Sequence, residues 1–290
     1  MDVISFVKKH YNINAKAVSK YPNKDVWLIK SSDEIYILKD NQRFDYLLIE
    51  EEANKILNRN HIVTHQIIKN TDGYLCTGSF ALFTYVPGVY KENFSLDEIE
   101  SSLSFLAEYN KALAKVKNHD LDKITEYDDA KDYDYLINEL PKRIASYQIG
   151  EGKKALISKG IQIIKDNQTK IESLPKQIIH ADLGSDNFLF YKGFIYSIID
   201  FTPDYDIEDY SLAQYIYWSV YHSQIWNYEK IEIIKDIYYT KSGKEDPNLL
   251  YPLLIKAALF RIIPQLNIGN TSLDKRFSFL EFIIKGYDKN

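Results

Sequence analysis

The sequence has a single cysteine, Cys76, in 290 residues. One thiol cannot form an intramolecular disulfide or a cysteine-rich zinc site, so both kinds of cross-link are excluded. No segment reaches the roughly 18 consecutive apolar residues that cross a membrane. The first residues, MDVISFVKKHYNIN, also lack the sustained apolar stretch of a signal peptide. We therefore expect a cytoplasmic protein in a reducing compartment, without a membrane partner.

The sequence has no strong excess of either charge. Its 36 lysine and arginine residues face 41 aspartate and glutamate residues, which gives a formal net charge of −5. Because a nucleic-acid partner usually requires a basic patch, we expect none, and a neutral or cationic ligand fits the charge better. With 45% hydrophobic and 27% charged residues the chain is typical of a globular protein. Its length favours two lobes, and the composition gives no indication of oligomeric state.

The first part of the sequence predicts strands around one helix. Apolar residues at helical spacing favour a helix over 45–60. Short alternating runs separated by polar turns, such as the turn at Pro22-Asn23, predict strands. These strands cover residues 15–21, 26–30, 34–39, 66–70, 74–78 and 79–86. We expect residues 1–86 to form an N-terminal lobe with an antiparallel sheet.

Beyond this lobe the apolar period changes to that of helices, and residues 87–290 predict a mainly helical second lobe. Pro141 is expected to interrupt one of its helices. Residues 188–200 instead predict a hairpin that turns at Lys192-Gly193. The expected helices span residues 96–116, 132–147, 152–167, 207–222, 229–239, 248–266 and 273–287. Together the two parts indicate an α+β fold.

The stretch HADLGSDNFLF contains His180, Asp182 and Asn187 at the spacing His-x-Asp-x-x-x-x-Asn. A kinase catalytic loop uses this arrangement, in which the aspartate accepts or orients the acceptor proton and the asparagine ligates Mg²⁺. Asp200, at the end of the following hairpin, suits a second metal ligand, and Mg²⁺ prefers such oxygen ligands. The alternative interpretation is structural, because aspartate and asparagine also cap turns.

These motifs resemble those of the aminoglycoside phosphotransferase and choline kinase-like family, whose members are small-molecule relatives of the protein kinases. The resemblance implies a bilobal protein-kinase-like fold, with ATP in the cleft and a hydroxyl-bearing acceptor on the helical lobe. It also implies that Asp182 is the catalytic base and that Asn187 and Asp200 hold magnesium. In this comparison His180 braces the loop, and Asp209 in DYSLA resembles an aspartate that steadies it.

A kinase-like first lobe needs a lysine on its third strand, paired with the nucleotide phosphates and with a glutamate on the next helix. Lys39 ends the third predicted strand, EIYILK, and three glutamates follow at 50–52. Glu52 lies three residues after Ile49 and four before Ile56, on the face expected to be buried. We therefore expect Glu52 to be the partner of Lys39, although a solvated acidic run remains an alternative.

The segment SFALFTYVPG resembles the family's last N-lobe strand and hinge, which implies that Thr84, Tyr85 and Val86 meet adenine. An ordinary buried strand that ends at Pro-Gly would look the same. Kinase phosphate loops are rich in glycine, yet residues 18–27 contain none. Possible phosphate contacts in this loop are limited to Ser19, Asn23 and Lys24.

The acceptor is the least determined part of the prediction. Acidic side chains after Asp200 suit either ammonium groups or a helix N-terminus. The aromatic residues there suit either a quaternary amine or a core. Arg261 suits either a carboxylate ligand or an internal ion pair. The acidic side chains are Asp204, Asp206 and Glu208, and the aromatic ones are Tyr217, Trp218, Tyr221 and Trp226.

We hypothesise an ATP- and Mg²⁺-dependent transferase that phosphorylates a hydroxyl of a small molecule. An aminoglycoside-like or amino-alcohol acceptor is favoured, with homoserine next. The alternative is a catalytically silent kinase-like binding or structural protein, which the glycine-free loop suggests.

Overall fold

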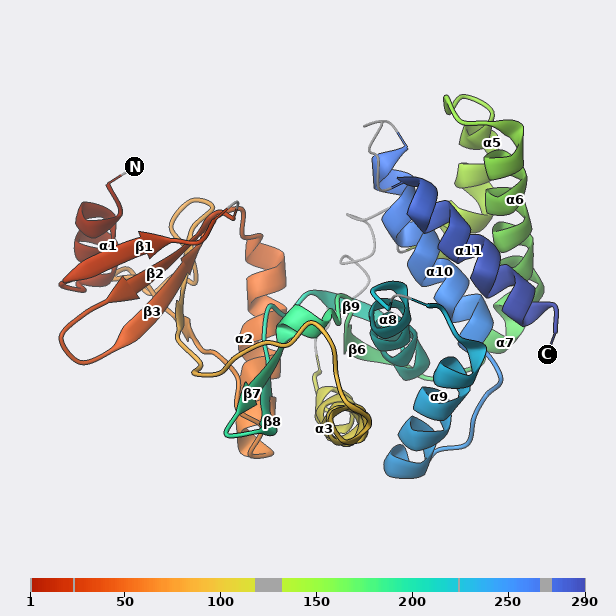
Figure 1. The fold of residues 1–290 in the computed structure, drawn as a ribbon. Coiled ribbons are helices and arrows are strands. Elements are labelled where there is room, and N and C mark those ends of the chain that lie inside the picture. The colour runs from red at the N-terminus through yellow and green to blue at the C-terminus, as the bar shows by residue number, and fades with distance from the viewer. Residues whose placement is uncertain (1, 23, 118–131, 224, 267–272, 290) are drawn as a thin grey trace. The chain divides into compact units, whose positions relative to one another are not determined.

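The structure is a computed structural model that describes residues 2–22, 24–117, 132–223, 225–266 and 273–289. Asn23, one of the possible phosphate contacts, lies outside the described residues. The chain divides into two compact units (Figure 1). Unit 1 consists of residues 1–89 with 189–201, and unit 2 of residues 90–188 with 202–290. The hairpin segment 189–201 thus belongs to unit 1. The predicted lobe boundaries, 1–86 and 87–290, stay a prediction.

Unit 1 contains a five-stranded antiparallel sheet in the order β1-β2-β3-β5-β4. Its strands are β1 (Ala17–Lys20), β2 (Val26–Lys30), β3 (Ile35–Lys39), β4 (Ile67–Ile68) and β5 (Ala81–Thr84). The predicted strand at 74–78 is wrong. Thr77 and Phe80 form only an isolated bridge there, because the chain turns back on itself at Gly78, whose φ is 62°. That conformation favours glycine and ends a strand.

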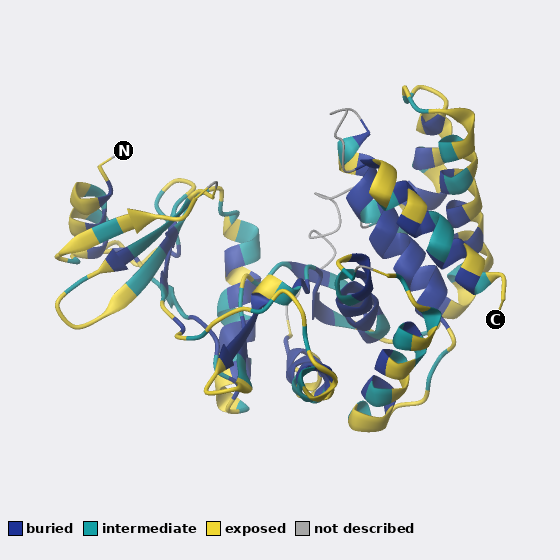
Figure 2. Ribbon diagram, in the orientation of Figure 1, coloured by how far each residue is buried: buried dark blue, intermediate teal, exposed yellow. Residues whose placement is uncertain are grey.

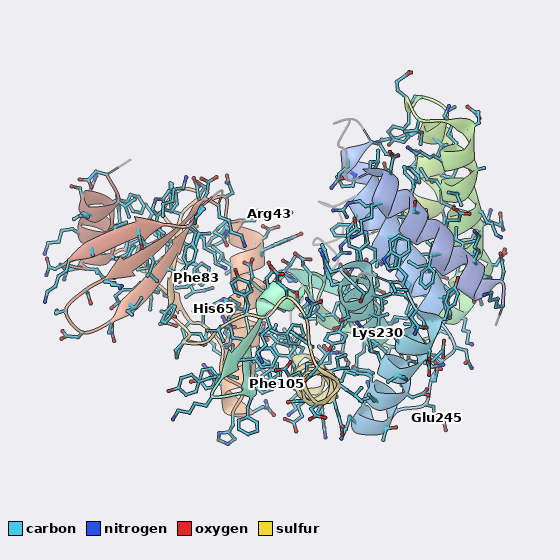
Figure 3. All side chains as sticks on the ribbon, viewed as in Figure 1. Arg43, His65, Phe83, Phe105, Lys230 and Glu245 are labelled. Carbon is cyan, nitrogen blue, oxygen red and sulfur yellow. The ribbon has the colours of Figure 1, made fainter. Side chains whose placement is uncertain are left out.

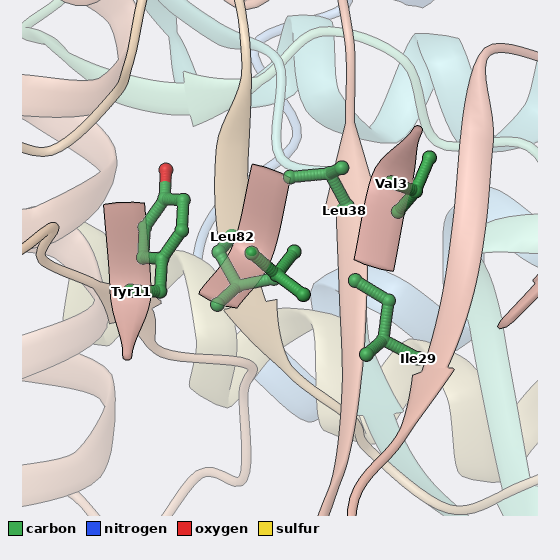
Figure 4. Close-up of a cluster of buried hydrophobic side chains, with 6 residues drawn as sticks. Val3, Tyr11, Ile29, Leu38 and Leu82 are labelled. Carbon is green, nitrogen blue, oxygen red and sulfur yellow. The ribbon is translucent and has the colours of Figure 1, made fainter. Parts of the chain in front are cut away.

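Helix α1 (Val3–Tyr11), which we did not predict, covers one face of the sheet. Asp2 caps its first turn by accepting the N–H of Ile4 at 3.1 Å. Val3 and Val7 then fall on one helical face and join a buried cluster with strand residues that include Leu38 (Figure 4). A short helix of this kind is hard to detect, because its apolar face has only a few positions.

Helix α2 (Phe44–Arg59) supplies the other apolar cluster of the sheet. Its Leu47 belongs to this cluster together with Phe83 of β5, and Ile37 of β3 packs against the cluster. Successive strand residues point to opposite faces, so Lys39 lies on the same face as Ile37, and Leu38 lies on the face that α1 covers. The alternation in EIYILK therefore sets the side on which the lysine emerges.

The hairpin of β7 (Phe188–Tyr191) and β8 (Phe194–Ile198) turns at Lys192-Gly193 as predicted. Both turn residues have positive φ, 52° and 87°, as a two-residue type I′ turn requires. Ser197 anchors β8 to the chain after α2, since its hydroxyl donates to the Val63 carbonyl at 2.7 Å. A bridge between Val89 and Phe190 anchors β7. These bonds explain why the hairpin groups with unit 1.

Unit 2 is mainly helical, as predicted. Pro141 does interrupt the helix around it: a π-helical turn, η1 (Tyr135–Glu139), precedes α5 (Leu140–Ile144), because proline cannot donate the backbone bond of a regular helix. The other helices are α3 (Leu96–Leu113), α6 (Glu151–Asp166), α7 (Gln168–Glu172), η2 (Ser185–Asn187), α8 (Glu208–Tyr221), α9 (Tyr228–Ser242), α10 (Leu250–Ile262), η3 (Ile263–Gln265) and α11 (Leu273–Tyr287).

One two-stranded antiparallel sheet accompanies these helices. It pairs β6 (Lys176–His180) with β9 (Pro203–Ile207), and the sequence analysis did not predict a strand at 203–207. In the helical layer α10 contacts α6, α8 and α11, and it is buried along nearly its whole length (Figure 2). None of the helices in the described part of the chain has the length and hydropathy required to span a membrane.

Candidate active site

His180 is the last residue of β6 and is fully buried. Its Nδ1 accepts the backbone N–H of Asp182 at 3.2 Å and lies 3.5 Å from the backbone nitrogen of Thr202. A neutral ring that accepts at Nδ1 carries its proton on Nε2. His180 thus connects the loop after β6 with the residue that precedes β9, and its role in bracing the loop stays a prediction.

Asn187 closes the loop that Asp182 opens. Its Nδ2 donates to the backbone carbonyl of Asp182 at 2.6 Å, so the two residues are held together across the turn η2. Within the described ranges the side-chain oxygen of Asn187 has no hydrogen-bond donor near it. This amide oxygen therefore remains available to a metal ion.

The Asp182 carboxylate is held at one oxygen only. Its Oδ1 accepts from Trp218 Nε1 at 3.3 Å and from Arg261 Nη2 at 3.2 Å. For Oδ2, the part of the chain that the structure describes supplies no donor, and the side chain is 50% exposed. The carboxylate is thus oriented by Oδ1 and presents Oδ2 to solvent.

Arg261 makes the internal ion pair that was one of its two predicted roles. Its guanidinium lies 4.6 Å from the ring centres of both Tyr217 and Trp218, and Nη1 donates to the Ala257 carbonyl at 3.1 Å. Burial lowers the pKa of Arg261, and the Asp182 carboxylate opposes that shift. The sequence did not indicate that its partner is the candidate base, because 79 residues separate the two.

In unit 1, Lys39 contacts the other predicted aspartate. Its Nζ lies 2.7 Å from Asp200 Oδ1 and 5.0 Å from the centre of the Phe83 ring. The lysine side chain is only 15% exposed, whereas the aspartate is 58% exposed. Asp200 has a φ of 59°, a conformation that costs energy for a residue with a side chain. The structure thus brings together two side chains that lie 161 residues apart in the sequence.

Among the three glutamates of α2, Glu50 is the most buried. It bonds to His65, whose ring makes an edge contact with Phe83 at 4.9 Å (Figure 3). Glu52 is half-buried on the same helix. Its expected pairing with Lys39 stays a prediction.

The predicted hinge residues continue from the sheet. The amide N–H of Thr84 donates to the Gln66 carbonyl at 2.9 Å, and that of Tyr85 donates to the Ile35 carbonyl at 3.1 Å. Val86 is buried. An adenine ring would therefore have to use other backbone groups of this segment, and its contact with residues 84–86 stays a prediction.

Asp209, near the start of α8, accepts a hydrogen bond from the Tyr239 hydroxyl of α9. Burial raises the pKa of the Asp209 carboxyl. Its predicted support of the loop 180–187 stays a prediction.

The acidic side chains considered for ammonium recognition are buried. Asp206 lies 2.5 Å from Lys256 Nζ, and both side chains are almost wholly inaccessible. Glu208 accepts from the Tyr238 hydroxyl at 2.6 Å and pairs with Lys244. Asp204 is also buried. These carboxylates are buried within unit 2, and Asp206 and Glu208 are paired with Lys256 and Lys244.

A pocket lies beside the loop that follows Asp182. Lys230 enters it from α9 and donates to the Ser219 carbonyl at 2.9 Å and to the Ser223 hydroxyl at 3.0 Å (Figure 3). Burial lowers the pKa of Lys230. The other lining residues are Glu92, Asn93, Phe94, Ile99, Leu183, Ser185, Phe188 and Tyr215.

The binding of a metal ion by Asn187 and Asp200 stays a prediction. In the ranges that the structure describes, no three histidine, cysteine, aspartate or glutamate side chains gather closely enough to hold one. Asn187 and Asp200 offer an amide and a carboxylate, which suit Mg²⁺ when phosphate oxygens complete its coordination.

Comparison with known proteins finds the kind of family that the sequence motifs resemble. A sequence model described as the phosphotransferase enzyme family matches residues 16–207. No curated protein matches the chain by sequence. Solved structures do match, and they confirm the predicted bilobal α+β fold.

Three of these structures illustrate the similarity. A thermostable mutant of aminoglycoside phosphotransferase APH(4)-Ia in complex with AMP-PNP and hygromycin B has 13% identity, a TM-score of 0.69, and 98% of each chain covered. Choline kinase LicA from Streptococcus pneumoniae has 11% identity, a TM-score of 0.67 and the same coverage. Amicoumacin kinase hAmiN in complex with AMP-PNP, Ca²⁺ and Ami has 14% identity and a TM-score of 0.67, with 98% of this chain and 91% of that one covered.

Proposed function

This chain belongs to the phosphotransferase enzyme family, and from that premise we propose that it transfers the γ-phosphoryl group of ATP to a hydroxyl of a small molecule. The observation that carries the proposal is the Asp182 carboxylate, which is fixed through Oδ1 and presents Oδ2. A carboxylate held in this way suits a base that must meet one hydroxyl in one orientation.

The proposed reaction begins when the acceptor hydroxyl donates a hydrogen bond to Asp182 Oδ2. The hydroxyl oxygen forms a bond to the γ-phosphorus, and the bond from that phosphorus to the β–γ bridging oxygen breaks. ADP leaves with the electron pair of the broken bond. The acceptor proton passes to the Asp182 carboxylate and then to solvent.

Lys39 is proposed to hold the nucleotide phosphates, supported by Glu52, while residues 84–86 meet the adenine. The ion pair of Lys39 with Asp200 supports this role. Asp200 is the proposed ligand of a phosphate-bound Mg²⁺ ion, so the ion pair keeps the Lys39 ammonium group close to where the phosphates would lie. Asn187 and Asp200 would hold Mg²⁺. When bound, the ion neutralises negative charge on the phosphates. His180 and Asp209 are proposed to support the loop.

The sequence ranked an aminoglycoside-like or amino-alcohol acceptor ahead of homoserine. Acidic groups and aromatic faces after Asp200 suited such an acceptor, but nothing in the sequence settled the order. The acidic groups are buried and Arg261 occupies two of the aromatic faces, so this support is removed. The acceptor class is therefore argued separately below.

The proposal is tested by measuring nucleotide binding and turnover in the same protein. A ligand at about 100 times its Kd stabilises the folded state by about 2.7 kcal/mol, so ATP with Mg²⁺ should raise the melting temperature clearly. ADP release should depend on an added hydroxyl compound. No stabilisation at millimolar nucleotide would favour the catalytically silent alternative.

Asp182→Asn separates binding from chemistry. Because a positioned base contributes about 10²- to 10⁴-fold, turnover should fall by at least 100-fold while the melting shift with ATP persists. Asp166→Asn, an exposed aspartate at the end of α6, is the matched control and should retain full turnover. Retained turnover in Asp182→Asn would remove Asp182 from its role.

A further inference from the structure

Three cationic side chains from α10 and α11 gather around two tyrosines of α8. The Arg261 guanidinium lies 4.6 Å from the Tyr217 ring. Lys275 Nζ lies 4.6 Å and the Arg276 guanidinium 5.7 Å from the Tyr221 ring. The two rings stack with centres 5.4 Å apart, so the three cations are neighbours. We call Arg261, Lys275 and Arg276 the basic cluster.

The basic cluster lies next to the candidate base and has too few carboxylates to balance it. Asp182 pairs with Arg261. Over the described ranges, no carboxylate forms an ion pair with Lys275 or Arg276, and the adjacent Asp274 pairs with Lys153 instead. Of the three cations, Arg261 alone has an ion-paired carboxylate among the described residues, while Asp186 and Glu92 act electrostatically on His222 together with Lys275 and Arg276. An excess of positive charge attracts anions and repels cations.

Arg276 also has hydrogen-bond donors that lack an acceptor. Its Nε and Nη1 are shielded from solvent and, within the described part of the chain, have no hydrogen-bond partner. The Tyr217 side chain is a hydrogen-bond partner of Arg276. Burial raises the pKa of Tyr217 to about 12, and Arg261 and Arg276 oppose this rise. Shielded donors without acceptors are costly and rare in native proteins. A planar guanidinium with two unused donors matches a carboxylate or phosphate.

We propose that the acceptor is a hydroxylated small molecule that carries a carboxylate or phosphate, and that Arg276, with Lys275 beside it, binds this anionic group near Asp182. The inference rests on the proposed function and names the acceptor class for the same site. Arg261 keeps its place as a positioning residue, since its charge is already engaged by Asp182.

The test compares acceptors that share a hydroxyl and differ in charge. ADP release is measured with hydroxy acids such as homoserine and glycerate, with glycerol 3-phosphate, with neutral glycerol, and with the cations choline and kanamycin. We expect turnover with a hydroxy acid or the phosphate ester, and at least 100-fold lower kcat/KM for its neutral counterpart. Comparison of the hydroxy acids with glycerol 3-phosphate shows whether the site binds a carboxylate or a phosphate.

The matched variants assign the anion to Arg276. Arg276→Gln should raise KM for the anionic acceptor at least tenfold with little change in kcat, and Arg276→Lys should recover part of the loss. Arg143→Gln is the control, because Arg143 also lies over a tyrosine ring, 5.3 Å from Tyr135, and is exposed on α5. Its kinetics should match those of the wild type.

Anion binding is also measured without turnover. With saturating ADP and Mg²⁺ present, citrate or inorganic phosphate should change the tryptophan fluorescence of the wild type saturably, and at least tenfold more weakly in Arg276→Gln. Three results would overturn the proposal: turnover confined to neutral or cationic acceptors, no anion binding in either assay, or loss of anion binding in Lys230→Gln but not in Arg276→Gln. Failure of the proposed function is distinguishable, because it would abolish the melting shift with ATP.

Discussion

At the scale of single residues, Lys256 shows how unit 2 uses charge inside its core. Its Nζ lies 3.8 Å and 4.2 Å from the rings of Tyr133 and Tyr210 and forms an ion pair with Asp206. The Tyr133 hydroxyl lies 3.3 Å from both oxygens of that carboxylate. Since Asp206 and Tyr210 are buried, removal of the lysine would leave a carboxylate without its counter-charge.

We expect Lys256→Met to lower the free energy of unfolding by about 3–5 kcal/mol, the usual cost of breaking a buried pair at one side. Adding Asp206→Asn should restore part of this loss, because the second change removes the isolated charge. Urea denaturation gives both values. Lys159→Met, which breaks a half-exposed pair with Asp288, is the control and should change stability little. A double variant as unstable as the single one would contradict this account.

At the scale of elements, α3 begins with a complete capping box. The Ser95 hydroxyl accepts the N–H of Glu98, and the Glu98 carboxylate accepts the N–H of Ser95 at 2.9 Å. Ser95→Ala should therefore destabilise the protein by about 1 kcal/mol. Ser104→Ala, in the middle of the same helix, should be neutral or slightly stabilising, because alanine favours helix interiors. Thermal or urea unfolding of the two variants checks the contrast, and equal losses would argue against a role for the cap.

The elements differ in how far the sequence determines them. The long helices were predicted closely, α11 at 273–287 being an example, because each presents an apolar face over several turns. Strand β9 was missed, since PDYDI buries two aspartates and so looks like a polar loop. Asp206 pairs with Lys256, which lies 50 residues further along the sequence, so no local pattern indicates this partner.

The candidate site, too, could be predicted from the sequence only in part. The spacing of His180, Asp182 and Asn187 is local, so the sequence was sufficient to suggest the loop. The contacts of Asp182 with Trp218 and Arg261 come from two other helices, and no local pattern could indicate them. Arg276 was not singled out, because its unused donors become visible only when the neighbouring side chains are in place.

At the scale of the whole molecule, unit 1 is assembled from two separate stretches of chain. The polypeptide passes between the units at residues 89–90, 188–189 and 201–202. Both ends of the hairpin segment 189–201 therefore continue into unit 2, where Thr202 contacts His180. If unit 2 unfolds, the hairpin segment keeps its bonds to unit 1, such as those of Ser197, Phe190 and Asp200, but loses the continuation of both its ends, and an isolated two-stranded hairpin is barely stable.

We therefore expect the two units to unfold in one transition. The three tryptophans allow a direct measurement, because Trp27 lies in unit 1 while Trp218 and Trp226 lie in unit 2. In a variant with Trp218→Phe and Trp226→Phe, the fluorescence of Trp27 reports on the sheet, and far-ultraviolet circular dichroism reports mainly on the helices of unit 2. Both signals, followed in the same urea titration, should give one midpoint. If the Trp27 signal instead persists to higher urea than the helical signal, unit 1 is stable without the continuation of its hairpin, and the coupling through residues 189–201 is contradicted.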